Sequence, residues 1–331
     1  GGKEDLSVQH YAALCTFHTG KPCKYTFTRE ESLLCHPKRH GMELEMTTGC
    51  DEKGVLTAMT VKIIADTGAY ASLGTAVLER ACTHACGPYI IPNVELDGYC
   101  VYTNNPPAGA FRGFGVPQSN FGAEANLDQL ADLAGIDRWE IRYRNAVEPG
   151  KVLANGQICG DDTAIKETLL AVKEDYYNNK YAGIACAFKN TGIGVGLPDI
   201  GRCRIGIRNG RVVIYSAASC IGQGLATIMI QIVSETAGID GEYISFNKPD
   251  SSLCPDSGAT TASRQTLFTG EACRQAALKL KAALETRTLE DLEGQDYEGE
   301  FRGITDPINS SKENPQTHVA YSYATHVAIL N

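Results

Sequence analysis

The chain has 331 residues, which is enough for one large domain or two ordinary domains with substantial hydrophobic cores. Its net charge of −9 argues against nucleic acid or an anionic membrane as the main partner. No run approaches the ~18 apolar residues that a membrane helix needs. The 13 irregularly spaced Cys suit no disulfide framework and favour a reducing, cytoplasmic compartment.

Residues 5–20 carry apolar side chains at helical spacing and predict a helix that ends at Gly20, followed by a short strand over 24–28. The strand-like runs 42–48 and 55–65 flank a turn at 51–54 and predict a hairpin. Pro106-Pro107 and the glycines of 108–115 interrupt regular structure. An amphipathic helix is then predicted to end near Gly135 and to bury Phe121, Leu127, Leu130 and Leu133, with helical character resuming over 139–145.

The stretch 147–162 is rich in Gly, Pro and polar residues and predicts a long loop, followed by a helix over 163–176. Asn209-Gly210 between two β-like runs predicts a second hairpin, because both turn residues must accept positive φ. A helix ending at Gly238 and another beginning at Thr269 as N-cap come next. Residues 287–317 predict loop or edge structure, and 317–330 a strand.

These elements predict an α+β protein of two mixed α/β subdomains, residues 1–150 and 151–331, the second truncated at its C-terminus. We expect the chain to be a piece of a longer subunit. Cys82 and Cys86 are the closest Cys pair, but no run of His or Cys partners accompanies them, so a zinc site is disfavoured.

Four Gly-rich turns could bring backbone N–H groups close to an anionic ligand, which suggests a large phosphate-bearing cofactor. Taken singly, each turn more often serves a tight chain reversal. The turns are Gly1-Gly2, AGAFRGFG at 108–115, IGQG at 221–224 and SGATTAS at 257–263. The stretch GIGVGLPDIG at 192–201 misses the G-x-G-x-x-G pattern, so a dinucleotide fold is rejected.

Several segments resemble the molybdenum hydroxylases, the family of xanthine dehydrogenases and aldehyde oxidases. AFRGFGVPQ at 110–118 resembles the family's molybdopterin signature, and GGKED at the start is similar to the end of its F-G-G-K-E turn. IGQG with the following helix and DSGATTASRQ at 256–265 resemble two later cofactor segments, and 78–113 is similar throughout. Within the family, these segments most resemble those of bacterial xanthine dehydrogenases described as selenium-dependent.

The resemblance implies that molybdopterin, with its cytosine dinucleotide form left open, contacts Arg112, Gly113, Gly222, Gln223, Ala262 and Ser263. It implies no metal ligand from a side chain. Glu4, Arg80 and Phe114 match the family's substrate wall, with Arg80 also stabilising negative charge in the transition state. Without the family context, Glu4 and Arg80 would be interpreted as a surface pair, Phe114 as a core plug and Arg112 as a structural clamp.

Two departures from the family bear on function. Gly192 and Ile193 stand where the animal enzymes have a Phe–Thr pair, so one stacking ring is missing. The general-base glutamate of the family belongs to a later G-x-G-E motif that this chain does not reach. A carbon monoxide dehydrogenase is disfavoured, because Gly109-Ala110-Phe111 precedes Arg112 where that enzyme has a Cys-containing loop.

The resemblance implies a hydroxylase that oxidises a purine, xanthine or hypoxanthine, with oxygen from water and hydride transfer to the molybdenum centre. [2Fe-2S] and FAD centres are expected on other domains or subunits, in an oligomer. One alternative is a hydroxylase of another N-heterocycle or an aldehyde, like nicotinate dehydrogenase. Another is that this chain alone has no activity until its missing parts join.

Overall fold

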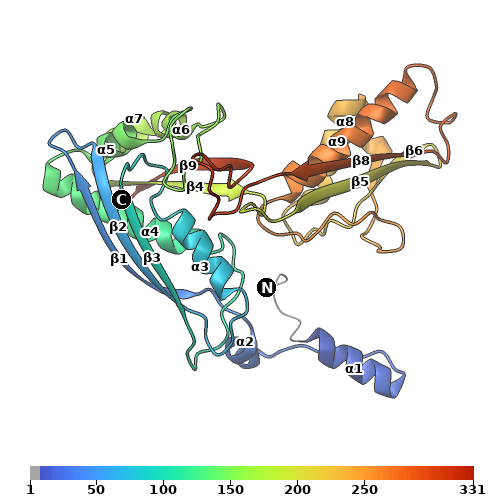
Figure 1. The fold of residues 1–331 in the computed structure, drawn as a ribbon. Helices are drawn as coiled ribbons and strands as arrows, with labels where there is room; N and C mark the ends of the chain where they lie inside the picture. Colours follow the sequence, from blue (N-terminus) through green and yellow to red (C-terminus); the bar gives the residue numbers. More distant parts are fainter. Residues whose placement is uncertain (1–7) are drawn as a thin grey trace. The chain divides into compact units, whose positions relative to one another are not determined.

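The computed structural model describes residues 8–331, which form two compact units (Figure 1). Unit 1 comprises the described part of Gly1–Lys189 together with Ser322–Asn331, and unit 2 comprises Asn190–Tyr321. The predicted division at 150/151 therefore differs from the division into compact units. Residues up to 189 pack within unit 1: Trp139 Nε1 donates to the carbonyl of Leu169 at 3.0 Å.

Unit 1 contains a three-stranded sheet in the order β1-β2-β3, with β1 antiparallel to β2 and β3 parallel to it. Helix α4 packs on β1 (Figure 1). Gly122 of α4 leaves room there for the side chains of Leu44 and Met46. Helices α1 and α2 bury no residue. The elements are α1 (Gln9–Thr19), α2 (Arg29–Cys35), β1 (Gly41–Cys50), β2 (Leu56–Asp66), α3 (Gly74–Thr83), β3 (Val94–Val101), α4 (Val116–Ala134), α5 (Arg138–Asn145), α6 (Ile165–Ala171), α7 (Lys173–Tyr177), and the paired β4 (Ala182–Thr191) and β9 (Ala320–Ile329).

Unit 2 is a four-stranded sheet in the order β7-β6-β5-β8, with helices α8 and α9 packed together on one of its faces (Figure 1). Its core holds the fully buried Ile205, Ile214, Met229 and Leu280, which come from both sheet and helices. The elements are β5 (Asp199–Arg208), β6 (Arg211–Tyr215), α8 (Leu225–Ala237), the 3-10 helix Gly241–Tyr243, β7 (Ile244–Phe246), α9 (Gln265–Leu284) and β8 (Asp296–Gly303). No helix in residues 8–331 is long and apolar enough to cross a membrane.

The α+β class is confirmed, as are both hairpins and the helix ends marked by glycine. Asn209 and Gly210 have φ of 55° and 68°, as their turn requires. Gly20, Gly135 and Gly238 end α1, α4 and α8 in the left-handed conformation.

Three local predictions are wrong. Residues 24–28 form no strand, because Thr28 instead caps α2: its side chain accepts from the Glu31 N–H, and Glu31 accepts from the Thr28 N–H in return. Helix α9 begins at Gln265, so Thr269 lies inside it and donates to the Gln265 side chain. On α4, Phe121 and Leu133 are 76% and 87% exposed, because the buried face follows smaller residues such as Ala123 and Ala131.

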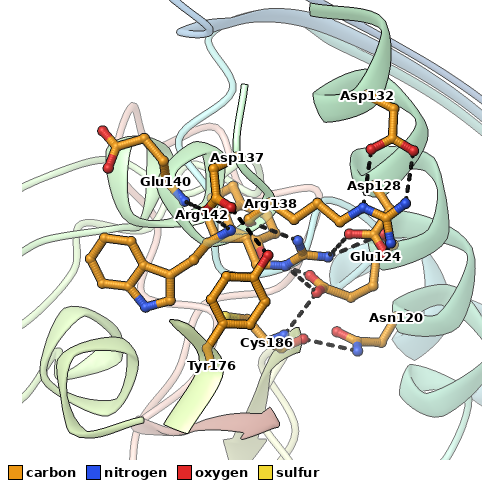
Figure 2. A network of polar contacts seen from close by, with 12 residues as sticks. Asn120, Glu124, Asp128, Asp132, Asp137, Arg138, Glu140, Arg142, Tyr176 and Cys186 are labelled. Atoms are coloured by element: carbon orange, nitrogen blue, oxygen red, sulfur yellow. Dashed lines mark hydrogen bonds and ion pairs between the residues drawn. The ribbon is translucent and has the colours of Figure 1, made fainter. Parts of the chain in front are cut away.

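A buried ion-pair network anchors α4, the helix that follows the Gly-rich 108–115 turn (Figure 2). Arg142 of α5 is fully buried; its Nε donates to Glu124 Oε2 at 2.8 Å and its Nη2 lies 2.7 Å from Asp128 Oδ1. Glu124 also accepts from the Tyr89 hydroxyl at 2.6 Å and from the Cys186 N–H at 2.8 Å. Burial raises the pKa of Tyr89 well above its usual range, and Glu124 adds to the shift, so the hydroxyl keeps its proton.

A second buried ion pair holds the 257–263 loop in unit 2. Arg264 and Asp199 pair with side chains only 1% and 3% exposed. The same guanidinium donates to the carbonyls of Ser257 at 2.5 Å and Ile200 at 2.6 Å. Asp199 Oδ2 accepts from the Ile193 N–H at 2.8 Å. One pair therefore fixes the 190s segment, the start of β5 and the 257–263 loop relative to one another.

We predict that Glu124→Gln lowers the free energy of unfolding by about 3–5 kcal/mol, because Arg142 would lose a buried counter-charge. The measurement is urea-induced unfolding followed by circular dichroism. The matched control is Glu140→Gln, which removes an exposed pair with Arg144 at 2.8 Å and should change little. Equal free energies of unfolding for the two variants would contradict the proposed contribution of the buried network to stability.

We also predict that Asp199→Asn destabilises the protein by about 3–5 kcal/mol, because it leaves the Arg264 guanidinium buried without a counter-ion. Limited proteolysis should cut the 257–263 loop faster in this variant. Glu271→Gln, which breaks an exposed pair with Arg274 on α9, is the control and should leave both readouts near wild type. A proteolysis pattern unchanged by Asp199→Asn would refute the role of the pair in ordering the loop.

Candidate functional site

The AFRGFG turn in unit 1 has three successive residues with positive φ: Gly113 at 91°, Phe114 at 53° and Gly115 at 94°. Such a backbone costs energy at Phe114 and needs glycine on both sides. A Cβ at Gly115 would lie 2.2 Å from the Val77 carbonyl oxygen and 3.0 Å from the Ala81 nitrogen, so the turn rests directly on the backbone of α3. This contact fixes where the half-buried Phe114 sits.

Arg80 belongs to the last turn of α3, next to Ala81, and is 7% exposed. Its carbonyl accepts from the Thr83 hydroxyl at 3.2 Å and lies 3.1 Å from Nδ1 of the buried His84, which fastens the end of the helix. Arg80 and Phe114 therefore come from adjoining segments of unit 1. Glu4, the third predicted member of the substrate wall, and the Gly1-Gly2 turn lie outside the described residues.

Arg112 precedes the turn and points its side chain to solvent, where it makes no hydrogen bond to another described residue. Its backbone carbonyl accepts from Arg39 Nη2 at 2.7 Å. At Gly113 a Cβ would lie 2.3 Å from Pro117 Cγ, so glycine is required there as well. Arg112 is thus an exposed cation on an anchored backbone.

In unit 2, the predicted cofactor residues Gly222 and Gln223 lie in the turn that opens α8. Gly222 and Gly224 have φ of 109° and 82°, and a Cβ on either would meet nothing within 4 Å. The Gln223 side chain folds back on its own turn: Oε1 accepts from the Ile221 N–H at 2.6 Å and Nε2 donates to the Ser219 carbonyl at 3.2 Å. The turn is therefore tight and internally bonded.

Ala262 and Ser263 are non-glycine residues with φ of 48° and 53°, so the SGATTAS loop also has a strained backbone. The Ala262 carbonyl accepts from the Gly192 N–H at 3.0 Å. The Thr260 hydroxyl accepts from the Ser219 N–H at 3.0 Å and donates to the Ser219 carbonyl at 2.9 Å. This double contact joins the SGATTAS loop to the segment that leads into the IGQG turn.

The backbone N–H groups of the IGQG turn favour negative charge. They lower the pKa of the exposed Cys220 thiol, with the N–H of Gly222 contributing most, followed by those of Leu225 and Gly224. The sequence analysis did not single out Cys220, although a Cys directly before a Gly-rich turn and a helix start was a usable signal.

Cys82 is half-buried and Cys86 is buried, and loss of solvent raises the pKa of Cys82 to about 11 and that of Cys86 to about 12. Among residues 8–331 no group of three or more His, Cys, Asp or Glu side chains could hold a metal ion. The described site residues form two groups, one in each unit. The groups are Arg80, Arg112, Gly113 and Phe114 in unit 1, and Gly222, Gln223, Ala262 and Ser263 in unit 2.

Both halves of the chain match models of a molybdopterin cofactor-binding domain, over residues 1–146 and 164–328. The chain is 36% identical over 301 residues to a probable xanthine dehydrogenase subunit of Bacillus subtilis, covering 88% of this chain and 40% of that protein. It is 48% identical over 174 residues to the nicotinate dehydrogenase large molybdopterin subunit of Eubacterium barkeri, covering 53% of this chain and 41% of that one. The chain thus spans about two fifths of these relatives.

Solved structures agree with this assignment. The aldehyde oxidoreductase from Desulfovibrio gigas matches 88% of this chain and 35% of its own length, with a TM-score of 0.80 at 26% identity. That from Desulfovibrio desulfuricans matches 98% of this chain and 38% of its own length, with a TM-score of 0.85 at 22% identity, and supports the fold alone. The chain therefore belongs to the molybdenum hydroxylases, of which it carries two molybdopterin cofactor-binding domains.

Proposed function

We propose that the protein containing this chain hydroxylates a purine, xanthine or hypoxanthine, with oxygen derived from water. The observation that carries the proposal is the nearly buried Arg80, on the helix against which the Phe114 turn rests. A guanidinium in a dry environment can bind a ring carbonyl and stabilise negative charge that builds on the ring. In this proposal Phe114 stacks on the ring, and Glu4 accepts from a ring N–H.

The residues of both units fit an anionic pterin. Gly222 and Gly224 leave open space, and the lowered pKa of Cys220 indicates that N–H groups of the same turn stabilise negative charge. Arg112 adds an exposed cation that donates to no other described residue. We assign cofactor binding to Arg112, Gly113, Gly222, Gln223, Ala262 and Ser263.

When bound, molybdopterin, in either its plain or its cytosine dinucleotide form, supplies the two-electron redox centre for the hydroxylation. The residues of this chain position the cofactor and the substrate and stabilise charge. We place the general-base glutamate in the part of the subunit outside this chain. We also propose that the complete protein is a cytoplasmic oligomer whose partner domains or subunits would hold [2Fe-2S] and FAD centres as electron acceptors, and that the chain by itself is inactive.

A second candidate is an N-heterocyclic carboxylate such as nicotinate. It is favoured by the 48% identity to the Eubacterium barkeri nicotinate dehydrogenase subunit, which exceeds the 36% identity to the xanthine dehydrogenase-like relative over a shorter stretch. Arg80 suits this substrate as well, because a guanidinium binds a carboxylate through two parallel hydrogen bonds. Gly192 and Ile193 also replace the Phe–Thr pair of the animal enzymes, so one of the two rings that would stack on a purine is missing.

The test is a substrate panel on the intact molybdenum enzyme: xanthine, hypoxanthine, nicotinate and an aromatic aldehyde, compared by kcat/KM. We expect a purine to give the highest value. Preference for nicotinate or the aldehyde would replace the purine proposal by the corresponding alternative. Metal and pterin analysis of the isolated chain tests separately whether its residues suffice to hold the cofactor.

In the intact enzyme we predict that Arg80→Met lowers kcat/KM for the best substrate by about 100-fold or more, because the transition-state charge loses its guanidinium. Arg144→Met, an exposed position on α5, is the control and should retain full activity. Molybdenum content is measured for both variants, so that lost chemistry is separated from lost cofactor. An Arg80→Met enzyme with full cofactor and wild-type kcat/KM would eliminate the role of Arg80.

A further inference from the structure

The segment Lys38–His40, which no motif of the sequence analysis included, runs along the cofactor loop of unit 1. The Lys38 N–H donates to the Pro107 carbonyl at 3.0 Å, and the Gly109 N–H donates to the Lys38 carbonyl at 2.8 Å. These bonds form a parallel bridge between Lys38 and Ala108. The first part of the loop is therefore held by backbone alone.

The Arg39 side chain makes the next two contacts along the loop. Its Nη2 donates to the Arg112 carbonyl at 2.7 Å, and its guanidinium carbon lies 4.9 Å from the centroid of the Phe111 ring. A planar guanidinium can stack on an aromatic face and donate in its own plane at the same time, which a lysine ammonium cannot do. Arg39 therefore holds the two residues directly before Gly113.

The far side of the loop is held by the third residue of the segment. Gln118, in the first turn of α4, donates from Nε2 to the carbonyl of His40 at 3.1 Å, and His40 is 2% exposed. Loss of the Arg39 side chain would leave the contacts of Lys38 and His40 in place. The contacts of Arg39 with Phe111 and Arg112 can thus be removed while the loop keeps its other contacts to this segment.

We propose that Arg39 is a positioning residue for the cofactor: it holds the backbone at Phe111 and Arg112, so that the Arg112 side chain and the Gly113 backbone face the pterin in a fixed arrangement. This inference rests on the proposed role of Arg112 and Gly113 in cofactor binding. In this proposal Arg39 acts through Phe111 and Arg112 and not by direct contact with the cofactor. Its effect is on how long the cofactor stays bound.

The test uses the intact molybdenum enzyme and three variants: Arg39→Met, Arg39→Lys and the control Arg29→Met on the exposed surface of α2. The readouts are the molybdenum and pterin content per chain, the rate of pterin release well below the thermal transition, and Tm. We expect Arg39→Met to release pterin about 10-fold faster or more, because a hydrogen bond from a charged donor is lost. Arg39→Lys should fall between Met and wild type, and Arg29→Met should match wild type.

Pterin release at the wild-type rate from folded Arg39→Met would overturn the inference and leave the proposed function standing. A release rate in Arg39→Lys equal to that of Arg39→Met, with both Tm values lowered alike, would also overturn it, since that pattern describes general loosening of the fold. A wild-type enzyme that holds no pterin would overturn the proposed function itself, and this inference with it.

Discussion

Buried guanidinium–carboxylate pairs hold the loops of this protein in place. Arg264 with Asp199 in unit 2, and Arg142 with Glu124 in unit 1, lie almost entirely out of water. Neither pair is a strong source of net stability, because desolvation of the charges offsets much of their attraction. What each pair provides is geometry: a planar group with several donors ties together backbone segments that share no secondary structure. In unit 2 the strained torsions of Ala262 and Ser263 lie directly before Arg264, whose guanidinium donates to the carbonyls of Ser257 and Ala259 in the same loop.

The parts of the fold that the sequence predicted well depend on local chemistry. Asn209-Gly210 predicts its hairpin, because few other residues accept positive φ twice in succession. Gly135 and Gly238 mark helix ends for the same reason. The failures occur where a competing local or tertiary contact decides the outcome. Residues 24–28 have the composition of a strand, but Thr28 caps helix α2. Phe121 lies on the solvent side of α4 because Gly122 and Ala123 let this helix approach β1 closely.

The candidate site divides in the same way. The AFRGFG, IGQG and SGATTAS segments could be found from the sequence, since their glycines and hydroxyls are contiguous. Arg39 and Asp199 could not be found, because each acts on a residue far along the chain: Arg39 on Arg112, and Asp199 on Arg264. No spacing rule links such positions in a single sequence. Within unit 1 the Phe114 turn lies against the helix of Arg80, and within unit 2 the SGATTAS loop contacts the segment before the IGQG turn. That both groups bind one pterin stays a prediction.

The structure leaves no space for a side chain at Gly115. The backbone of this residue sits against the carbonyl of Val77, so even one added methyl group would push the start of α4 away from α3. The distance between Arg80 on α3 and Phe114 in the turn would then increase. If Arg80 and Phe114 bind the substrate ring as proposed, a change in the ring that is accepted must come from exchanged side chains and not from a change in helix spacing.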